Sequence, residues 1–128
     1  MRIVLDTNVL ISAFFWKGNE RNILKKCKTR EYQLIISPQI FVEMRRVLSL
    51  KFSLPDEKIN EYERDIILFS IMVVPKGELK IVEDDPTDDI IVETAQLGKA
   101  EIIVTGNKHL TKLKEFEGIM IKKAGELL

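Results

Sequence analysis

The sequence predicts an α/β fold in which a mainly parallel sheet carries helices on both of its faces. Short runs rich in Ile and Val alternate with longer amphipathic segments, which is typical of βαβ units. The short runs are apolar at successive positions, as expected of parallel strands that are buried on both sides. Two of these runs end abruptly in polar residues, at 6–8 and at 105–107. Ligands bind at such strand ends in parallel sheets.

The elements of the first half follow from their starts and stops. Asn8 stands near the beginning of an apolar helix that Gly18 ends. Ser37 and Pro38 form a helix-start signal, because Ser can bind free backbone amides and Pro is tolerated at the first helical position. Pro55 opens another helix with apolar residues at helical spacing. We expect strands at 3–5, 34–36 and 72–74, and helices at 9–15, 20–28, about 38–50 and from 55 to about 69.

The second half begins with a mixed connector at 76–83 that includes a short extended piece at 81–82. Pro86, with Asp85 as a cap and acids in the first turn, then starts a helix that ends near Gly98. The remaining elements are strands at 102–104 and 119–121, with a short helix or turn between them. The central sheet is thus expected to have about five strands.

Composition limits the functional classes. The 128 residues, 45% of them hydrophobic, predict a single domain at 1–128. The 20 basic and 20 acidic residues cancel, so nucleic acid would have to be bound by a local patch or through a metal. Cys27 is the only cysteine, which excludes an intrachain disulfide and a thiolate zinc site and is typical of a cytoplasmic protein. The longest apolar stretch, at 66–74, is too short to span a bilayer, so no membrane partner is expected.

Several acids are expected to meet at one edge of the sheet. Asp6 closes the first strand, and Glu43 shares a helix face with core residues near the start of its helix. Asp88 heads the apolar stripe of the helix at 86–97, whereas Asp89 lies on its more polar side. This geometry favours Asp88, although the uncertainty of helix boundaries leaves Asp89 open. Asn107 adds an amide at the same edge.

Carboxylate and amide oxygens suit a hard cation such as Mg²⁺ or Mn²⁺, which can activate water for attack on a phosphate. Each acid also has a structural explanation. Asp6 can cap the following helix, Glu43 can pair with Arg46, and acids before a helix stabilise its dipole. The last explanation applies to Asp84, Asp85, Asp88 and Asp89. Their coincidence at one sheet edge favours a site.

The sequence gives weaker support for candidate substrate-binding residues. We name Ser37, Arg45 and His109, the last because it lies just beyond Asn107. The aromatic residues at 14–16 can stack on RNA bases but are better explained by packing or a dimer contact. The best local basic patch consists of Lys17, Arg21, Lys25, Lys26, Arg45 and Arg46.

The segments VLDTNVLISA, SPQIFVEMRRVL and DPTDDIIVETAQLGKAEIIVTGN, with a closing short strand, resemble the PIN domain family in its order. This is a family of metal-dependent ribonucleases that includes VapC-type toxins of toxin-antitoxin pairs. The resemblance implies a three-layer α/β/α sandwich, Mg²⁺ or Mn²⁺, endonucleolytic cleavage of single-stranded RNA and a homodimer. For the toxin members it also implies a protein antitoxin. Asp6, Glu43 and Asp88 match the acids of the family, and Asn8 and Thr105 match polar residues that support them.

Asn107 departs from the family pattern, because many members have a fourth Asp there. The loss of one charge is expected to weaken the binding of a second metal and to slow catalysis. The first hypothesis is therefore a metal-dependent endoribonuclease of weak activity. The alternative is a non-catalytic RNA- or partner-binding module with the same fold. A phosphatase with Asp6 as nucleophile is disfavoured, because Asn8 stands where that class needs a second acid.

Overall fold

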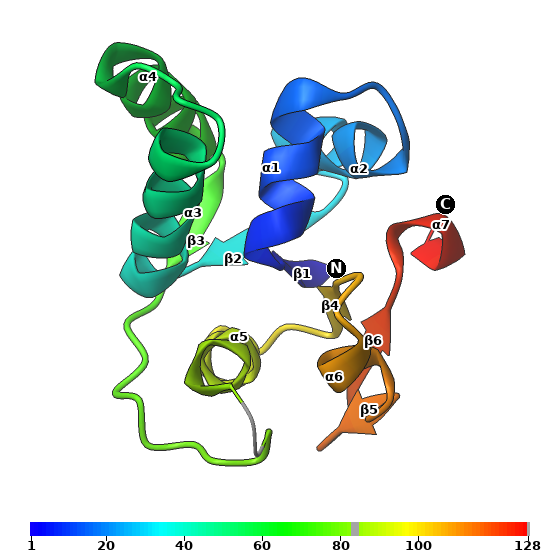
Figure 1. Cartoon of the computed structure of the whole chain (residues 1–128). Helices are drawn as coiled ribbons and strands as arrows, with labels where there is room; N and C mark the ends of the chain where they lie inside the picture. The colour runs from blue at the N-terminus through cyan, green and yellow to red at the C-terminus, as the bar shows by residue number, and fades with distance from the viewer. Residues whose placement is uncertain (83–84, 128) are drawn as a thin grey trace.

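The centre of the protein is a sheet of six strands (Figure 1). The computed structural model describes residues 1–82 and 85–127. In chain order the strands are β1 (Arg2–Leu5), β2 (Gln33–Ile36), β3 (Ser70–Met72), β4 (Ile102–Val104), β5 (Glu115–Phe116) and β6 (Ile119–Lys122). Their order across the sheet is β3-β2-β1-β4-β6-β5, and all neighbours are parallel except β5 and β6. The predicted α/β class with a mainly parallel sheet is therefore confirmed.

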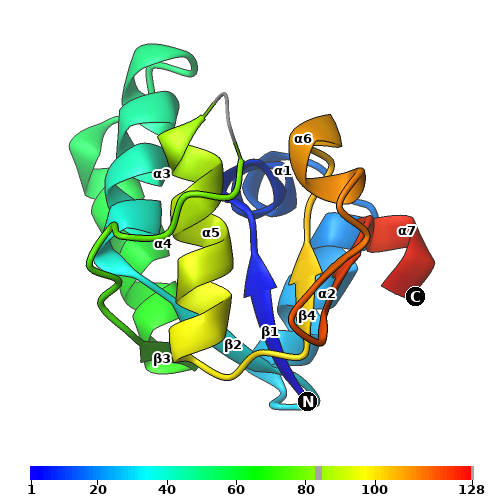
Figure 2. The same ribbon diagram turned by 90° about the horizontal axis from the view of Figure 1, so that it is seen from below.

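Helices cover both faces of this sheet and complete the predicted three layers. They are α1 (Thr7–Phe15), α2 (Asn19–Lys28), α3 (Pro38–Leu50), α4 (Asp56–Leu68), α5 (Pro86–Leu97), α6 (Lys108–Thr111) and α7 (Ala124–Leu127). Figure 1 shows α1 to α4 on one side of the sheet and α5 on the other. Figure 2 shows α5 alongside β1 and β2. Within the described ranges, none of the helices combines the length and apolarity that a membrane crossing requires.

Three details of the sheet differ from the prediction. The third strand is Ser70–Met72 instead of 72–74, because α4 ends at Leu68 and the chain pairs at once with β2. The short strand β5 was not expected, since its two residues form no apolar run. It pairs with β6 through a turn in which Glu117 and Gly118 both have positive φ, at 48° and 83°. No strand forms at 81–82, where the backbone amides bind a carboxylate.

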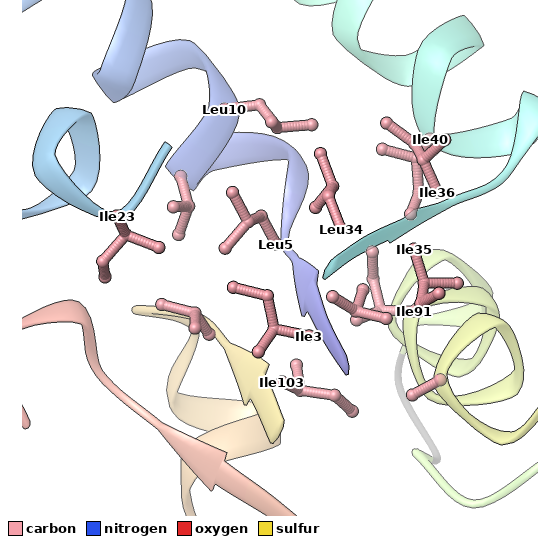
Figure 3. Packing of buried hydrophobic residues seen from close by; sticks show 14 of the residues in the cluster. Ile3, Leu5, Leu10, Ile23, Leu34, Ile35, Ile36, Ile40, Ile91 and Ile103 are labelled. Atoms are coloured by element: carbon pink, nitrogen blue, oxygen red, sulfur yellow. The ribbon is translucent and has the colours of Figure 1, made fainter. Parts of the chain in front are cut away.

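The core lies on both faces of the three central strands. Ile3, Leu34 and Ile103 have no exposed surface. Figure 3 shows these side chains among Leu5, Leu10 and their neighbours, with Ile91 of α5 on the other side of the sheet. Each such side chain contributes about 1.5–3 kcal/mol by leaving water. The end of α5 approaches β2 so closely that a side chain in place of Gly98 would collide with Ile35. Dense packing of this kind gives the sheet edge a fixed geometry.

The sheet topology brings distant polar residues to one edge. Leu5 of β1 pairs with Val104 of β4, and both strands run in the same direction. The residues that follow them are therefore side by side, and the Asp6 amide donates to the Val104 carbonyl at 3.0 Å. Helix α3 begins directly after β2 at the same edge. The carboxyl ends of the central strands thus form the base of the candidate site.

Candidate functional site

Asp6 and Thr105 form the base of the site. Asp6 is only 7% exposed, and its Oδ2 accepts a hydrogen bond from the Thr105 hydroxyl at 2.6 Å. The same hydroxyl oxygen accepts from the backbone amide of Asn107 at 3.0 Å. Thr105 therefore fixes the orientation of the Asp6 carboxylate. The sequence had suggested Thr105 as a residue that supports the acids.

Asp88 lies in the first turn of α5 and has one unsatisfied oxygen. Its Oδ1 accepts from the Asn107 side-chain amide at 2.9 Å. Its Oδ2 is buried and has no hydrogen-bond partner within the described residues. A buried carboxylate oxygen without a partner is costly, because it has lost its water and gained nothing in return. This oxygen is therefore suited to bind a cation.

Burial, with a smaller contribution from neighbouring acids, raises the pKa values of the acids at this edge. Burial raises the pKa of Asp88 to about 6, and the charges of Asp85 and Asp6 add to the effect, while His109 and Asn107 oppose it. Burial also raises the pKa of Asp6, although the hydrogen bond from Thr105 lowers it. Clustered carboxylates without a counter-charge behave in this way. The site consequently favours protons or cations.

Asp85 belongs to the same cluster, which the sequence did not reveal. It was expected only as a helix cap, and its Oδ1 does accept from the Thr87 amide at 2.9 Å. Its charge also acts on both Asp6 and Asp88. The available signal was its spacing, three residues before Asp88 across the start of a helix. Asp84, one of the acids considered with it, lies outside the described residues.

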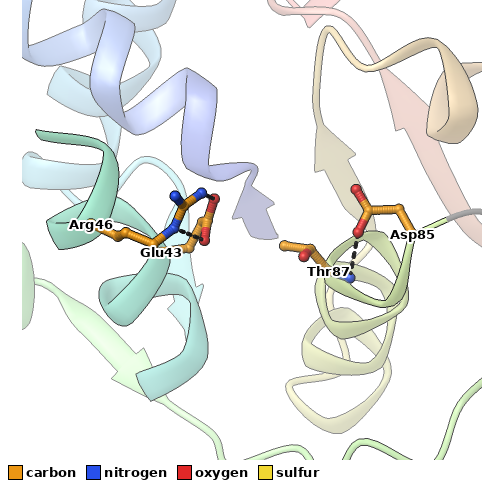
Figure 4. A network of polar contacts seen from close by, with 4 residues as sticks. All are labelled: Glu43, Arg46, Asp85 and Thr87. Carbon is orange, nitrogen blue, oxygen red and sulfur yellow. Dashed lines mark hydrogen bonds and ion pairs between the residues drawn. The ribbon is translucent and has the colours of Figure 1, made fainter. Parts of the chain in front are cut away.

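Glu43 is held by Arg46, as its structural explanation requires. Arg46 Nη2 donates to Glu43 Oε1 at 2.8 Å, and Nε donates to Oε2 at 3.1 Å. Figure 4 shows this pair on α3 opposite Asp85 and Thr87 at the start of α5. The negative charge of Glu43 nevertheless contributes to the raised pKa of Asp6. Glu43 is thus near the cluster, with both oxygens engaged.

Asn107, which was expected as a metal ligand, donates one hydrogen bond and accepts another through its side chain in this structure. Its Oδ1 accepts from the His109 backbone amide at 2.8 Å and caps α6. Its Nδ2 donates to Asp88, so both ends of the side chain are used. An aspartate at this position would add repulsion next to Asp88 where the amide now gives a hydrogen bond.

Asp89, the alternative to Asp88, has a different environment. Its Oδ1 accepts from the backbone amides of Ile81 at 2.9 Å and Val82 at 2.8 Å. Glu93 does the same for the amides of Gly77, Glu78 and Leu79 at 2.8–3.0 Å. Burial opposes the ionisation of Glu93, but these hydrogen bonds lower its pKa. Both acids fasten the connector between β3 and α5 to the helix.

The predicted substrate-binding residues have separate fates. Ser37 is fully buried, and its hydroxyl oxygen accepts from the Ile40 amide and from the Thr94 hydroxyl, which gives it a structural role. Arg45 pairs with Glu63 of α4 at 2.8 Å. His109 is exposed, and its electrostatic interaction with Asp88 lowers the pKa of Asp88.

Of the residues expected to support the acids, Asn8 is exposed in the first turn of α1. Within residues 1–82 and 85–127 its side chain makes no hydrogen bond to the acids. The sequence reasoning missed Thr7 next to it. Its buried hydroxyl has no partner among the described residues.

An apolar hollow adjoins the acids between α3 and α5. It has a volume of about 360 Å³, and its lining includes Glu43 and Thr7, the residue after Asp6. The other walls include Pro38, Val42 and Ile90. An apolar hollow beside charged groups provides room for the organic part of a ligand.

The acids suit a single hard cation better than a closed metal cage. Among residues 1–82 and 85–127, no three Asp, Glu, His or Cys side chains are close enough together to hold a metal ion. Mg²⁺, however, is commonly bound by one or two carboxylates, with water and substrate phosphate completing the shell. The unpaired Oδ2 of Asp88, close to the negative charge of Asp6, fits that requirement.

The fold and the site define an α/β protein with an acidic centre at the carboxyl ends of its parallel strands. The chain belongs to the PIN domain family, whose profile matches residues 2–109. Its fold is similar to that of a chain in the crystal structure of VapBC2 from Rickettsia felis bound to a DNA fragment from their promoter. That similarity has a TM-score of 0.66 and 16% identity, and covers 96% of this chain and 98% of the other. No curated protein matches the sequence.

Proposed function

We propose that this protein is a metal-dependent endoribonuclease that cleaves phosphodiester bonds of single-stranded RNA. The observation that carries the proposal is the buried, unpaired Oδ2 of Asp88 in a cluster with Asp6 and Asp85. PIN domain proteins are generally nucleases, which supports hydrolysis as the reaction class. The raised pKa of Asp88 is a cost that the metal-free protein bears and that a bound cation would remove.

The residues of the site have distinct tasks in this reaction. Asp6 and Asp88 would hold Mg²⁺ or Mn²⁺, which supplies a Lewis acid for the scissile phosphate and for the attacking water. Thr105 and Asn107 keep the two carboxylates oriented by hydrogen bonds of 2.6 and 2.9 Å. Asp88 must lose its proton before it can act as a ligand. His109 is exposed near Asp88, where its side chain can contact a substrate phosphate.

The Asn107 amide favours slow cleavage with one cation. Its oxygen is already bound to the His109 amide, so it adds no free acceptor to the site. A second cation would lack the negative charge that a carboxylate at this position provides. We expect the substrate phosphate to complete the coordination, and the rate to be limited accordingly.

We further propose that the chain is the toxin of a toxin-antitoxin pair. The similarity in fold to a chain of VapBC2 supports this assignment, together with the acidic site. The partners would then be single-stranded RNA, a protein antitoxin and a second copy of the chain in a homodimer, in the cytoplasm.

Purified protein with labelled single-stranded RNA of mixed sequence, with and without Mn²⁺, tests the proposal. We expect cleavage that depends on Mn²⁺ and is lost in Asp6→Asn. Asp65→Asn removes the same charge from an exposed position of α4 and should cleave as the wild type does. Cleavage by Asp6→Asn at the wild-type rate would contradict the proposal.

The second candidate is a non-catalytic RNA- or partner-binding module. The amide of Asn107 favours it, because it leaves the site one acid short. RNA binding without cleavage, together with no detectable Mn²⁺ binding, would support this alternative over the nuclease.

A further inference from the structure

Two consecutive arginines on α3 have different partners. Arg45 is bound by Glu63 and connects α3 to α4. Arg46 instead forms a fork with both oxygens of Glu43 beside the acidic cluster. The side chain of Arg46 is 57% exposed, and that of Glu43 is 29% exposed. Arg46 is therefore the member of the pair that is exposed and bound to an acid beside the cluster.

The fork makes Arg46 and a divalent cation competitors for Glu43. Both carboxylate oxygens are engaged, so Glu43 cannot bind a cation until the arginine leaves. Exposed ion pairs contribute little to stability, which means that this pair opens easily. The charge of Glu43 already acts on Asp6, so a cation held by Asp6 and Asp88 would attract it.

A released guanidinium has a natural second partner. Its planar set of donors matches a phosphate group, which is why arginine so often binds the backbone of nucleic acids. The arginine would be released at the same edge at which the proposed reaction places the scissile strand. Arg46 would then leave Glu43 and bind a phosphate in the same event.

We propose that Arg46 is an exchangeable counter-ion, which neutralises Glu43 in the metal-free protein and binds a phosphate of single-stranded RNA once a divalent cation engages Glu43. This inference rests on the proposed nuclease function and adds a substrate-binding residue to it. One consequence is linkage: because Mn²⁺ frees the arginine, it raises the affinity for RNA, and RNA raises the affinity for Mn²⁺ by the same factor. The metal-free protein has no free guanidinium at this position.

The test measures binding and not turnover. Mn²⁺ affinity is measured by calorimetry without RNA, and RNA affinity by fluorescence anisotropy in Mn²⁺. The probe is a labelled 2′-O-methyl RNA of mixed sequence whose integrity is checked on a gel. Arg46→Ala should bind Mn²⁺ about 1.5- to 5-fold more tightly, because the competitor is gone. It should bind the RNA about tenfold more weakly, because a charged hydrogen-bond donor is lost.

Arg64→Ala is the matched control, since it removes an exposed arginine from α4 and should change neither affinity. Glu43→Gln gives a reciprocal check. Its arginine has lost the charged, two-oxygen partner, so RNA affinity without Mn²⁺ should exceed that of the wild type.

Any other result of the two binding measurements overturns the inference. Equal Mn²⁺ affinity in wild type and Arg46→Ala would show that the arginine does not compete, and weaker Mn²⁺ binding would make it a support of the site. Unchanged RNA affinity would remove its phosphate-binding role, and no Mn²⁺ binding by either protein would remove the exchange. Absence of RNA cleavage with the expected binding changes would contradict the nuclease proposal alone.

Discussion

Two sides of α5 carry acids in opposite situations. Asp88 has a buried oxygen without a partner among the described residues, and its pKa is raised to about 6, first by burial and then by neighbouring acids. Asp89, the next residue, accepts two backbone amides from the connector. Glu93 accepts three, and its pKa is lowered despite burial. The helix thus places a destabilising acid, Asp88, next to the strand ends. Its stabilising acids, Asp89 and Glu93, accept hydrogen bonds from the connector.

The comparison teaches that environment, and not residue type, separates the candidate functional acids from the structural ones. The carboxylates of Asp89 and Glu93 satisfy backbone donors that would otherwise be unpaired. Among the described residues, the Asp88 carboxylate satisfies no backbone donor and accepts only from the side-chain amide of Asn107. We therefore expect substitutions on one side of the helix to cost stability, and those on the other side to cost activity.

The largest expected effect is on cleavage. Asp88→Asn should lower the rate of Mn²⁺-dependent RNA cleavage about 100- to 1,000-fold, because it removes a negatively charged ligand. Asp89→Asn changes the same atoms one residue away and should retain the rate under conditions in which it is folded. A time course on labelled single-stranded RNA measures both. Equal losses of cleavage rate in the two variants would show that the two sides of α5 do not differ in function.

The next effect is on stability. Glu93→Ala should lower the free energy of unfolding by about 2–4 kcal/mol, because it leaves the amides of residues 77–79 without their acceptor. Urea unfolding followed by circular dichroism measures this change. Glu101→Ala, at an exposed acid before β4, is the control and should stay within about 0.5 kcal/mol of the wild type. If Glu93→Ala also stayed within about 0.5 kcal/mol of the wild type, the stability of the connector would not depend on this carboxylate.

The pH dependence should also separate the two sides. The pKa of Asp88 is higher in the folded protein than its ordinary value of 3.8, so the folded state binds the proton more tightly. Its contribution to stability is present below pH 4 and is lost as the pH rises through about 6. The lowered pKa of Glu93 has the opposite sign, and its contribution is lost as the pH falls below its ordinary value of 4.5.

Asp88→Asn should therefore be more stable than the wild type at pH 7.5 by about 1–2 kcal/mol without metal, and equally stable near pH 4. Thermal melts across this range in the presence of a chelator provide the measurement. A constant difference between the two proteins at all pH values would mean that Asp88 does not titrate in this window.

The smallest effect concerns Asn107. Asn107→Asp places a fourth acid next to Asp88 and replaces a hydrogen bond by repulsion, so the metal-free protein should lose about 0.5–1 kcal/mol at pH 7.5. The same change should increase Mn²⁺ affinity, which calorimetry can detect. Unchanged Mn²⁺ affinity would show that this position does not contribute to the metal site.

Helical periodicity predicted that Asp88 heads the apolar stripe of α5, and Asp88 is buried beside Asn107 in the structure; its role as a metal ligand stays a prediction. Strand pairing likewise placed Asp6 next to Thr105, since parallel neighbours end at the same edge. These parts follow from regular geometry. The path of the connector does not, which is why the extended piece expected at 81–82 is instead bound by Asp89.

The pairing of Glu43 with Arg46 was foreseen from their spacing, but other side-chain partners were beyond the sequence. Nothing in the pair Arg45 and Arg46 shows which arginine faces the site, because that depends on where α4 packs and where Glu63 lies. Asp85 was expected to cap α5, yet it contributes to the charge of the cluster as well. The sequence also did not show that the side-chain oxygen of Asn107 caps α6. Each of these outcomes depends on tertiary contacts between segments that are remote in sequence or on the rotamer adopted.

The most direct measurement is the shift in melting temperature that Mn²⁺ causes in three proteins: wild type, Asp88→Asn and Asp89→Asn. A ligand that binds only the folded state raises its melting temperature. We predict an Mn²⁺-dependent rise in the wild type and in Asp89→Asn, from a lower starting value in the latter, and no rise in Asp88→Asn. A rise in Asp88→Asn equal to that of the wild type would contradict the assignment of the metal site to this side of α5.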